Sequence, residues 1–206
     1  MLEIKNVHKT FNKGTINEKK ALNGVNLHLD PGDFVTIIGG NGAGKSTTLN
    51  MVAGVYPIDQ GTIILDGKDI SDLPEYKRAY MLGRVFQDPM MGTAAGMQIE
   101  ENMAMANRRG KKRGLSWEIT KKEKEMFKEK LQMLDLGLED RMTSKVGLLS
   151  GGQRQALTLL MATLKKPSLL LLDEHTAALD PKTAKKVLDI TEKIVARDNL
   201  TTMMVT

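Results

Sequence analysis

The sequence predicts an α/β protein built around a mainly parallel sheet, and three observations point to this fold. A glycine-rich loop, "GGNGAGKST" at 39–47, follows a short apolar run and precedes an expected helix. The run "LLLL" at 169–172 is wholly apolar, which is typical of a parallel strand buried on both faces. Along the chain the order is strand, loop, helix, helical insertion, strand, helix, strand, which is the pattern of an α/β fold.

The first third of the chain is rich in expected strands. "LEIKNVHKTF" alternates apolar and polar residues, and "ALNGVNLHLDPGDFVTIIGG" contains two strands joined by a turn at Pro31 and Gly32. "GTIILDGKDI" adds a further strand pair with turn glycines. We therefore expect β-hairpins here, together with one helix after the loop.

The remaining segments are mostly helical. Apolar residues recur at helical spacing between 121 and 136, with Gly137 as a stop signal. A second helix is expected to start near Ser150, and a third to start at Pro181 with Asp180 as its cap. The last segment, "LTTMMVT", reads as a buried strand. Because a domain seldom stops inside such a strand, we expect residues to follow Thr206.

Composition excludes several classes of protein. The chain has 206 residues and no cysteine, so it is neither a disulfide scaffold nor a protein with thiolate metal ligands. Its formal net charge is +5, and "RRGKKR" at 108–113 holds five of its cations. This stretch is interpreted as a solvated loop, with contact to lipid headgroups or a partner as the alternative. Without interleaved aromatic residues, it does not indicate nucleic-acid binding.

The loop at 39–47 has the spacing of a phosphate-binding loop, Gly39-x-x-x-x-Gly44-Lys45-Ser46. Its glycines allow backbone N–H groups to point inward, and the following helix adds its positive end. The lysine supplies charge to the β- and γ-phosphates, and the serine hydroxyl suits Mg²⁺. The alternative is a glycine-rich turn with a chance lysine. The predicted triphosphate-binding residues of this loop are Gly39, Gly40, Asn41, Gly42, Ala43, Gly44, Lys45, Ser46 and Thr47.

Two carboxylates follow the apolar run, at the end of a strand where ligands bind in open α/β sheets. Because side chains alternate along a strand, Asp173 can face a Mg²⁺ ion while Glu174 faces a water near the γ-phosphate. Glu174 is then the candidate that orients or deprotonates this water. Two acidic residues that merely end a strand are the alternative.

A third motif, "LSGGQ" at 149–153, starts a helix at Ser150 and forms a second expected anion site. With the loop, Gln87 after "RVF", "DEH" and "AALD", it resembles the ATP-binding subunits of ABC transporters over the whole chain. The resemblance implies an ABC-type ATP-binding domain over residues 1–206, truncated at its C-terminus. Its fold would be a P-loop NTPase core with an antiparallel β subdomain and an α-helical subdomain inserted at about 89–160.

The resemblance also assigns roles to single residues. Gln87 would contact Mg²⁺ or the attacking water, and Phe11 would stack on adenine, a core phenylalanine being the alternative. Asp180 matches a loop that crosses the dimer interface, although a helix cap needs no further role. The signature of one subunit would complete the ATP site of the other in a head-to-tail homodimer. Its residues are Ser150, Gly151, Gly152 and Gln153.

Two features depart from the family pattern. His175 stands where the family usually has proline, either as a tolerated variant or as a group that tunes Glu174. The family's histidine at the γ-phosphate has no counterpart among His8, His28 and His175. The 206-residue chain is therefore expected to bind ATP but to hydrolyse it poorly, and the histidine is expected beyond Thr206.

The resemblance implies an ATPase that powers transmembrane transport through ATP-driven dimer closure. Its partners would be a second copy of itself, integral membrane permease subunits and an extracytoplasmic substrate-binding protein, with no nucleic acid. Its place would be the cytoplasmic face of the cell membrane. The stretch "DEHTAALDPKT" and the basic insertion more narrowly resemble ATPases of substrate-binding-protein-dependent uptake of aromatic amino acids. The alternatives are an exporter or lipoprotein-release ATPase, and a non-transport ABC ATPase.

Overall fold

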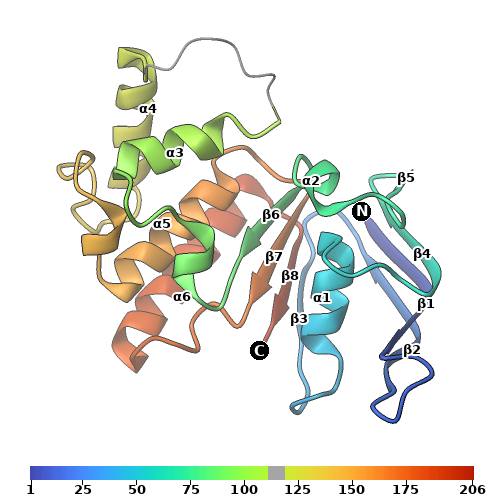
Figure 1. Ribbon diagram of the computed structural model, residues 1–206. Helices are drawn as coiled ribbons and strands as arrows, with labels where there is room; N and C mark the ends of the chain where they lie inside the picture. Colours follow the sequence, from blue (N-terminus) through green and yellow to red (C-terminus); the bar gives the residue numbers. More distant parts are fainter. Residues whose placement is uncertain (111–118) are drawn as a thin grey trace. The chain divides into compact units, whose positions relative to one another are not determined.

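The computed structural model describes residues 1–110 and 119–206, which form two compact units (Figure 1). The first unit comprises Met1–Arg84, Pro167–Asp173 and Asn199–Thr206. The second comprises Val85–Lys166 and Glu174–Asp198. The predicted α/β class is confirmed, since the chain contains a sheet with parallel strands, an antiparallel sheet and helices. Within the described ranges, no helix is both long and apolar enough to span a bilayer.

The antiparallel sheet of the first unit has the strand order β2-β1-β4-β5. Its register pairs Leu2 with Leu29 on one side and with Leu65 on the other, so the three leucines face one core. Its strands are β1 (Leu2–Phe11), β2 (Lys19–Leu29), β4 (Gln60–Leu65) and β5 (Lys68–Asp69).

The second sheet has the order β3-β8-β7-β6. Strand β8 runs parallel to β3 and to β7, and its Val205 is the register partner of both Ile37 and Asp173. The loop that follows β3 and the carboxylate that ends β7 therefore emerge at the same edge. The strands are β3 (Phe34–Ile37), β6 (Leu82–Val85), β7 (Leu169–Asp173) and β8 (Thr202–Val205).

The two strands and the turn expected at Pro31 and Gly32 are present, but they do not form a hairpin, because β2 and β3 belong to different sheets. Gly32 has φ 90° and donates its N–H to the Thr201 hydroxyl at 2.9 Å. A Cβ on Gly32 would lie 2.8 Å from Asn199 Oδ1. The turn is thus fastened to the residues that precede β8, which leads the chain into the parallel sheet.

Helix α1 (Lys45–Ala53) packs against β7 and β8. Its Leu49 belongs to the buried apolar cluster that also contains Leu2 of the antiparallel sheet and Leu171 of the parallel sheet. Both sheets and this helix therefore share one core, which fixes the start of α1 relative to the strand ends.

The second unit is helical. Helix α5 contacts α3, α4 and α6, and buried side chains such as Met103, Phe127 and Leu157 fill the space between them. The predicted helix starts at Ser150 and Asp180 are confirmed. The helices of this unit are α3 (Ile99–Asn107), α4 (Lys121–Gln132), α5 (Gly151–Thr163) and α6 (Pro181–Asp198), with the short 3₁₀ helices η1 (Pro89–Gly92) and η2 (Val146–Leu148).

Some boundaries differ from the expectations. Helix α4 ends at Gln132, and Gly137, with φ 66°, lies in the turn beyond it. Strand β6 and helix α3 were not among the predicted elements. Of the basic stretch at 108–113, residues 111–113 lie outside the described residues.

Arg78 is a charged residue inside the first unit. It lies at the end of the short helix α2 (Glu75–Arg78) and is only 2% exposed. Its Nη1 donates to the carbonyls of Met51 and Val52 at 2.6 and 3.0 Å, and other guanidinium nitrogens donate to Leu73 and Ser71. The guanidinium therefore satisfies carbonyls in the last turn of α1, where a positive charge is favoured.

We expect Arg78→Met to lower the free energy of unfolding by about 3 kcal/mol, because it leaves buried carbonyls without donors. Urea unfolding measures this loss. Lys77→Ala, a change of the exposed neighbour on α2, is the control and should change stability little. Equal stability of the Arg78 and Lys77 variants would contradict this role.

Candidate functional site

The glycine-rich loop leads directly into α1. Gly42 and Gly44 have φ 82° and 89°, which residues with a Cβ rarely adopt. At Gly44 a Cβ would also lie 2.7 Å from the Ala21 carbonyl oxygen. Lys45 begins the helix and curls back, so that its Nζ donates to the Gly39 carbonyl at 2.6 Å. The loop thus holds an ammonium group over its own backbone.

The N-terminus of α1 has the features of an anion site. No side chain caps it, and its first turn contains no acidic residue. Residues 39–43 and Ser46 are exposed. First-turn N–H groups without a capping side chain are donors for a phosphate group, and the helix dipole favours negative charge there. The residues present therefore fit a triphosphate.

Strand pairing in the first unit brings Phe11 next to Lys19, whose side chain reaches the glycine-rich loop. Phe11 is half-buried and pairs with Lys19 across β1 and β2. The Lys19 ammonium lies 3.4 Å from the position of a Cβ on Gly42, so a second cation accompanies the loop. Phe11 packs edge to face on Tyr56, with ring centroids 5.2 Å apart. Phe11 is therefore not a fully buried core residue.

Asp173 ends β7 in the first unit, and its side chain is 17% exposed. The register places it level with Ile37, two strands away, or roughly 10 Å at the usual strand spacing. A serine hydroxyl at the start of α1 and this carboxylate are hard oxygen ligands of the kind that Mg²⁺ prefers. Ser46 and Asp173 thus fit as a magnesium-binding pair.

Arg84 is a neighbour of Asp173 that the sequence analysis did not single out. Its Nη2 donates to Asn50 Oδ1 of α1 at 2.7 Å and lies 3.5 Å from Asp173 Oδ2. This guanidinium links the candidate metal ligand to the helix that follows the loop. Outer partners of this kind orient a ligating carboxylate. An arginine within a four-residue strand gives no such signal without the fold.

Glu174 and His175 begin the next part of the second unit. Glu174 is half-buried and has φ 42°, an uncommon value for a residue with a Cβ. His175 is 2% exposed, and its Nε2 lies 3.2 Å from Thr191 Oγ1 of α6. Burial lowers the pKa of His175 to about 4, so that its ring is neutral at pH 7. Its side chain is therefore turned to α6 and buried.

Gln87 is exposed in the segment between β6 and η1. The preceding carbonyl, that of Phe86, accepts a 3.0 Å hydrogen bond from Gln155 Nε2 on α5. Gln155 is fully buried, whereas Gln87 is not. The helix that follows the signature therefore holds the segment that presents Gln87, a link that the sequence analysis missed.

The signature forms a capping box at the start of α5. Ser150 Oγ accepts from the Gln153 N–H at 3.3 Å, and Gln153 Oε1 accepts from the Ser150 N–H at 3.1 Å. Gly152 is buried, and a Cβ there would lie 2.1 Å from Thr183 Cγ2. Close packing on α6 therefore accounts for this glycine. Ser150 and Gly151 are exposed and remain open to a ligand.

Asp180 caps α6, as one of the two hypotheses for it states. Its Oδ1 accepts from the Thr183 N–H at 3.1 Å. Hydrogen bonds from the Thr183 side chain and backbone hold the pKa of Asp180 below its ordinary value. The cap fixes the end of the loop that starts at Glu174.

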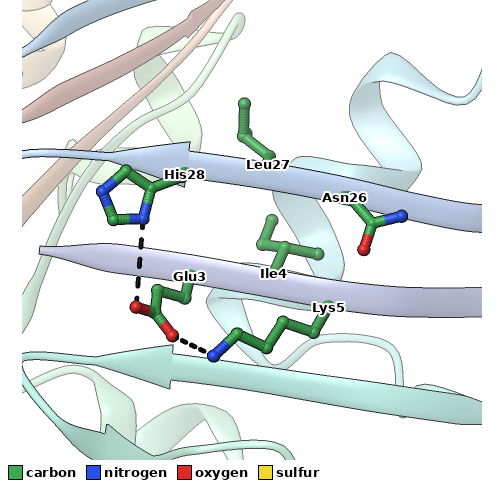
Figure 2. A pocket seen from close by; sticks show the side chains of 6 residues that line it. All are labelled: Glu3, Ile4, Lys5, Asn26, Leu27 and His28. Carbon is green, nitrogen blue, oxygen red and sulfur yellow. Dashed lines mark ion pairs between the residues drawn. The ribbon is translucent and has the colours of Figure 1, made fainter.

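A hollow on the antiparallel sheet is a separate surface feature (Figure 2). Glu3 stands there between Lys5 and His28, with Glu3 Oε1 3.9 Å from His28 Nδ1. The hydrogen bond from Lys5 lowers the pKa of Glu3. The hollow thus carries surface ion pairs.

Across the two described ranges no cluster of three or more His, Cys, Asp or Glu side chains could hold a metal.

The predicted site residues therefore fall into two groups. The first unit contains Phe11, the loop with Ser46, and Asp173. The second unit contains Gln87, Glu174 and the signature at 149–153. Each group has its own candidate phosphate-binding helix start.

Relatives with curated functions are similar to this chain in sequence. A tyrosine transport ATP-binding protein of Clostridioides difficile is 44% identical over 206 residues, covering 100% of this chain and 82% of the relative. A methionine import ATP-binding protein of Corynebacterium efficiens is 35% identical, covering 100% of this chain and 55% of the relative. A spermidine/putrescine import ATP-binding protein of Haemophilus influenzae is 37% identical, covering 91% and 46%. The chain spans about half the length of the last two relatives.

Solved structures agree with this similarity. An ATP-binding cassette solved as a dimer in a post-hydrolysis state, bound to ADP and inorganic phosphate, matches with a TM-score of 0.81 at 30% identity. The match covers 100% of this chain and 88% of that one. A cassette of an ABC transporter in its ADP conformation matches with the same TM-score at 27% identity, covering 100% and 80%. The sequence profile of the family described as ABC transporter matches residues 22–177. The chain therefore belongs to the ABC transporter family, as an ATP-binding cassette.

Proposed function

We propose that this chain binds ATP and supplies residues for its hydrolysis, which in the intact protein powers transmembrane uptake. The observation that carries the proposal is the uncapped first turn of α1, which follows the glycine loop and begins with Lys45. Asp173, at the same edge of the parallel sheet, supplies the acidic partner that a metal-bound triphosphate requires.

The residues divide the work. The N–H groups of the loop and of the first turn of α1, together with Lys45, bind the phosphates, and Phe11 stacks on the adenine ring. Ser46, Gln87 and Asp173 would hold Mg²⁺, which would supply positive charge to the β- and γ-phosphates. Glu174 takes the proton of the attacking water at its carboxylate. Water attack on the γ-phosphorus breaks its bond to the β–γ bridging oxygen and releases ADP and phosphate.

The signature is proposed to act on the ATP of a second copy. Its exposed Ser150 and Gly151 begin α5, so they offer another helix start to phosphate. Each chain then has two separate phosphate-binding sites, the loop before α1 and the signature at the start of α5. A head-to-tail homodimer would therefore hold two shared ATP molecules. The dimeric state of a solved relative with ADP and phosphate supports this arrangement.

Transport requires partners in the membrane. The import functions of the methionine and spermidine/putrescine relatives support uptake through permease subunits fed by an extracytoplasmic substrate-binding protein. The chain would then act at the cytoplasmic face. The tyrosine transport relative, 44% identical, supports an aromatic amino acid as the cargo.

In the intact protein, Glu174→Gln should abolish most hydrolysis, by about 10²-fold or more, because an amide cannot take the proton of the water. Since closure needs ATP but reopening needs hydrolysis, the variant should accumulate as an ATP-bound dimer. Light scattering after gel filtration in excess MgATP measures the dimer, and phosphate release measures the rate.

Two controls accompany this measurement. Glu192→Gln, a change of an exposed carboxylate on α6, should leave the rate and the oligomeric state unchanged. Lys45→Ala added to Glu174→Gln should remove nucleotide binding and return the protein to monomers. A Glu174→Gln variant that binds ATP and stays monomeric would contradict the shared site.

Transport is tested by co-purification. Tagged protein from membranes solubilised in mild detergent should bring a multi-span membrane protein with it, identified by mass spectrometry. Ribosomal subunits or DNA without any membrane protein would refute transport and leave only the ATPase.

A further inference from the structure

The loop between β7 and α6 holds Glu174 in an unusual backbone conformation. Its φ of 42° lies in the left-handed region, which is costly for a residue with a Cβ. Such a conformation persists only where the surrounding structure holds it from several sides. The contacts of the adjoining residues therefore bear on how the carboxylate of Glu174 is presented.

His175, the residue directly after Glu174, makes the first of these contacts. The side chain is 2% exposed and reaches α6, where its Nε2 lies 3.2 Å from Oγ1 of Thr191, itself 1% exposed. The partners are 16 residues apart and both belong to the second unit. A buried polar pair of this kind has no competing water and is directional.

The hydrogen positions in this pair follow from counting donors. The Thr191 hydroxyl has one hydrogen, which it donates to the Val187 carbonyl at 2.8 Å. Thr191 Oγ1 can then only accept from His175, so the imidazole carries its hydrogen on Nε2. The chain of hydrogen bonds runs from the ring through the hydroxyl to the backbone of α6.

The far end of the loop is tied to the same helix. The Asp180 carboxylate caps α6 at Thr183, and the Ala177 N–H donates to the Glu174 carbonyl at 2.9 Å. Thr183 and Thr191 are eight residues apart, or about 12 Å along a helix. Two anchors on one rigid helix, with a turn between them, restrain the loop from both ends.

We propose that His175 is a positioning residue: its hydrogen bond to Thr191 anchors the loop and so orients the neighbouring Glu174 carboxylate for hydrolysis. The inference rests on the proposed catalytic role of Glu174. It explains why a buried imidazole is useful at this position, since an apolar side chain would fill the space without fixing a direction. The role is mechanical and involves no change in the charge of the ring.

Thr191→Val tests it, because valine keeps the shape of threonine and removes the acceptor. In the intact protein we expect kcat for ATP hydrolysis to fall at least about tenfold, with KM and the Kd for ATP within about twofold of wild type. Thr191→Ser keeps the hydroxyl and should retain kcat within about twofold. Thermal unfolding and circular dichroism establish that each variant is folded.

A folded Thr191→Val variant with wild-type kcat would overturn the inference, as would a Thr191→Ser variant that loses as much as the valine variant. If the valine variant does not fold, His175→Leu replaces it. We then expect the same fall in kcat, and a folded His175→Leu variant with wild-type kcat would overturn the inference. A merely structural role would instead lower the unfolding temperature without a selective loss of kcat.

Glu174→Gln separates this inference from the proposed function. If Glu174→Gln hydrolyses ATP at the wild-type rate, the catalytic role of Glu174 is wrong. If Glu174→Gln is inactive while Thr191→Val is fully active, only the positioning inference is wrong. If Glu174 is catalytic and Thr191 helps to position it, adding Thr191→Val to Glu174→Gln should not lower the residual rate further. Both substitutions then remove the same contribution of the Glu174 carboxylate.

Discussion

The alignment of three parallel strand ends is the constraint on which the nucleotide site depends. Strand β8 lies between β3 and β7, and its Val205 is level with both Ile37 and Asp173. A shift of one residue in the pairing of β7 with β8 would turn the side chain of Asp173 to the other face of the sheet. The buried side chains of Leu171 and Met203 fix this register through the shared core with α1.

Polar contacts then refine what the register provides. Arg84 connects Asp173 to Asn50 on α1, so the proposed metal ligand and the proposed phosphate-binding helix are linked by side chains as well as by packing. Two hydrogen bonds have a similar effect in the second unit. Gln155 of α5 binds the segment that contains Gln87, and His175 binds the loop that contains Glu174 to α6. The proposed site thus depends on residues that would not contact the nucleotide.

Much of this could be predicted from sequence because the signals are local. The loop spacing, the apolar run of β7 and the helix starts at Ser150 and Asp180 each depend on a few consecutive residues. Strand β6 escaped prediction because Gly83 and Arg84 interrupt a segment of only four residues.

The pairs that form across the fold could not be predicted. Nothing in the sequence links His175 to Thr191, and the meaning of His175 stayed open until its burial and its partner were known. Likewise, Gly152 fits a phosphate-binding turn by its residue type, whereas the structure explains it by contact with Thr183. The two strands around Pro31 were predicted, but not their separation into two sheets, because β3 pairs with β8 at residues 202–205.

The proposed function requires that the loop of one copy and the signature of another close on the same ATP. The absence of cysteine allows a direct test, with Asn41→Cys in one Glu174→Gln chain and Leu148→Cys, at a position 71% exposed, in a differently tagged one. We predict that a short bismaleimide joins the two tagged chains in MgATP and not without nucleotide. Cross-linking that ATP does not increase, or that joins only like variants, would refute the shared ATP site.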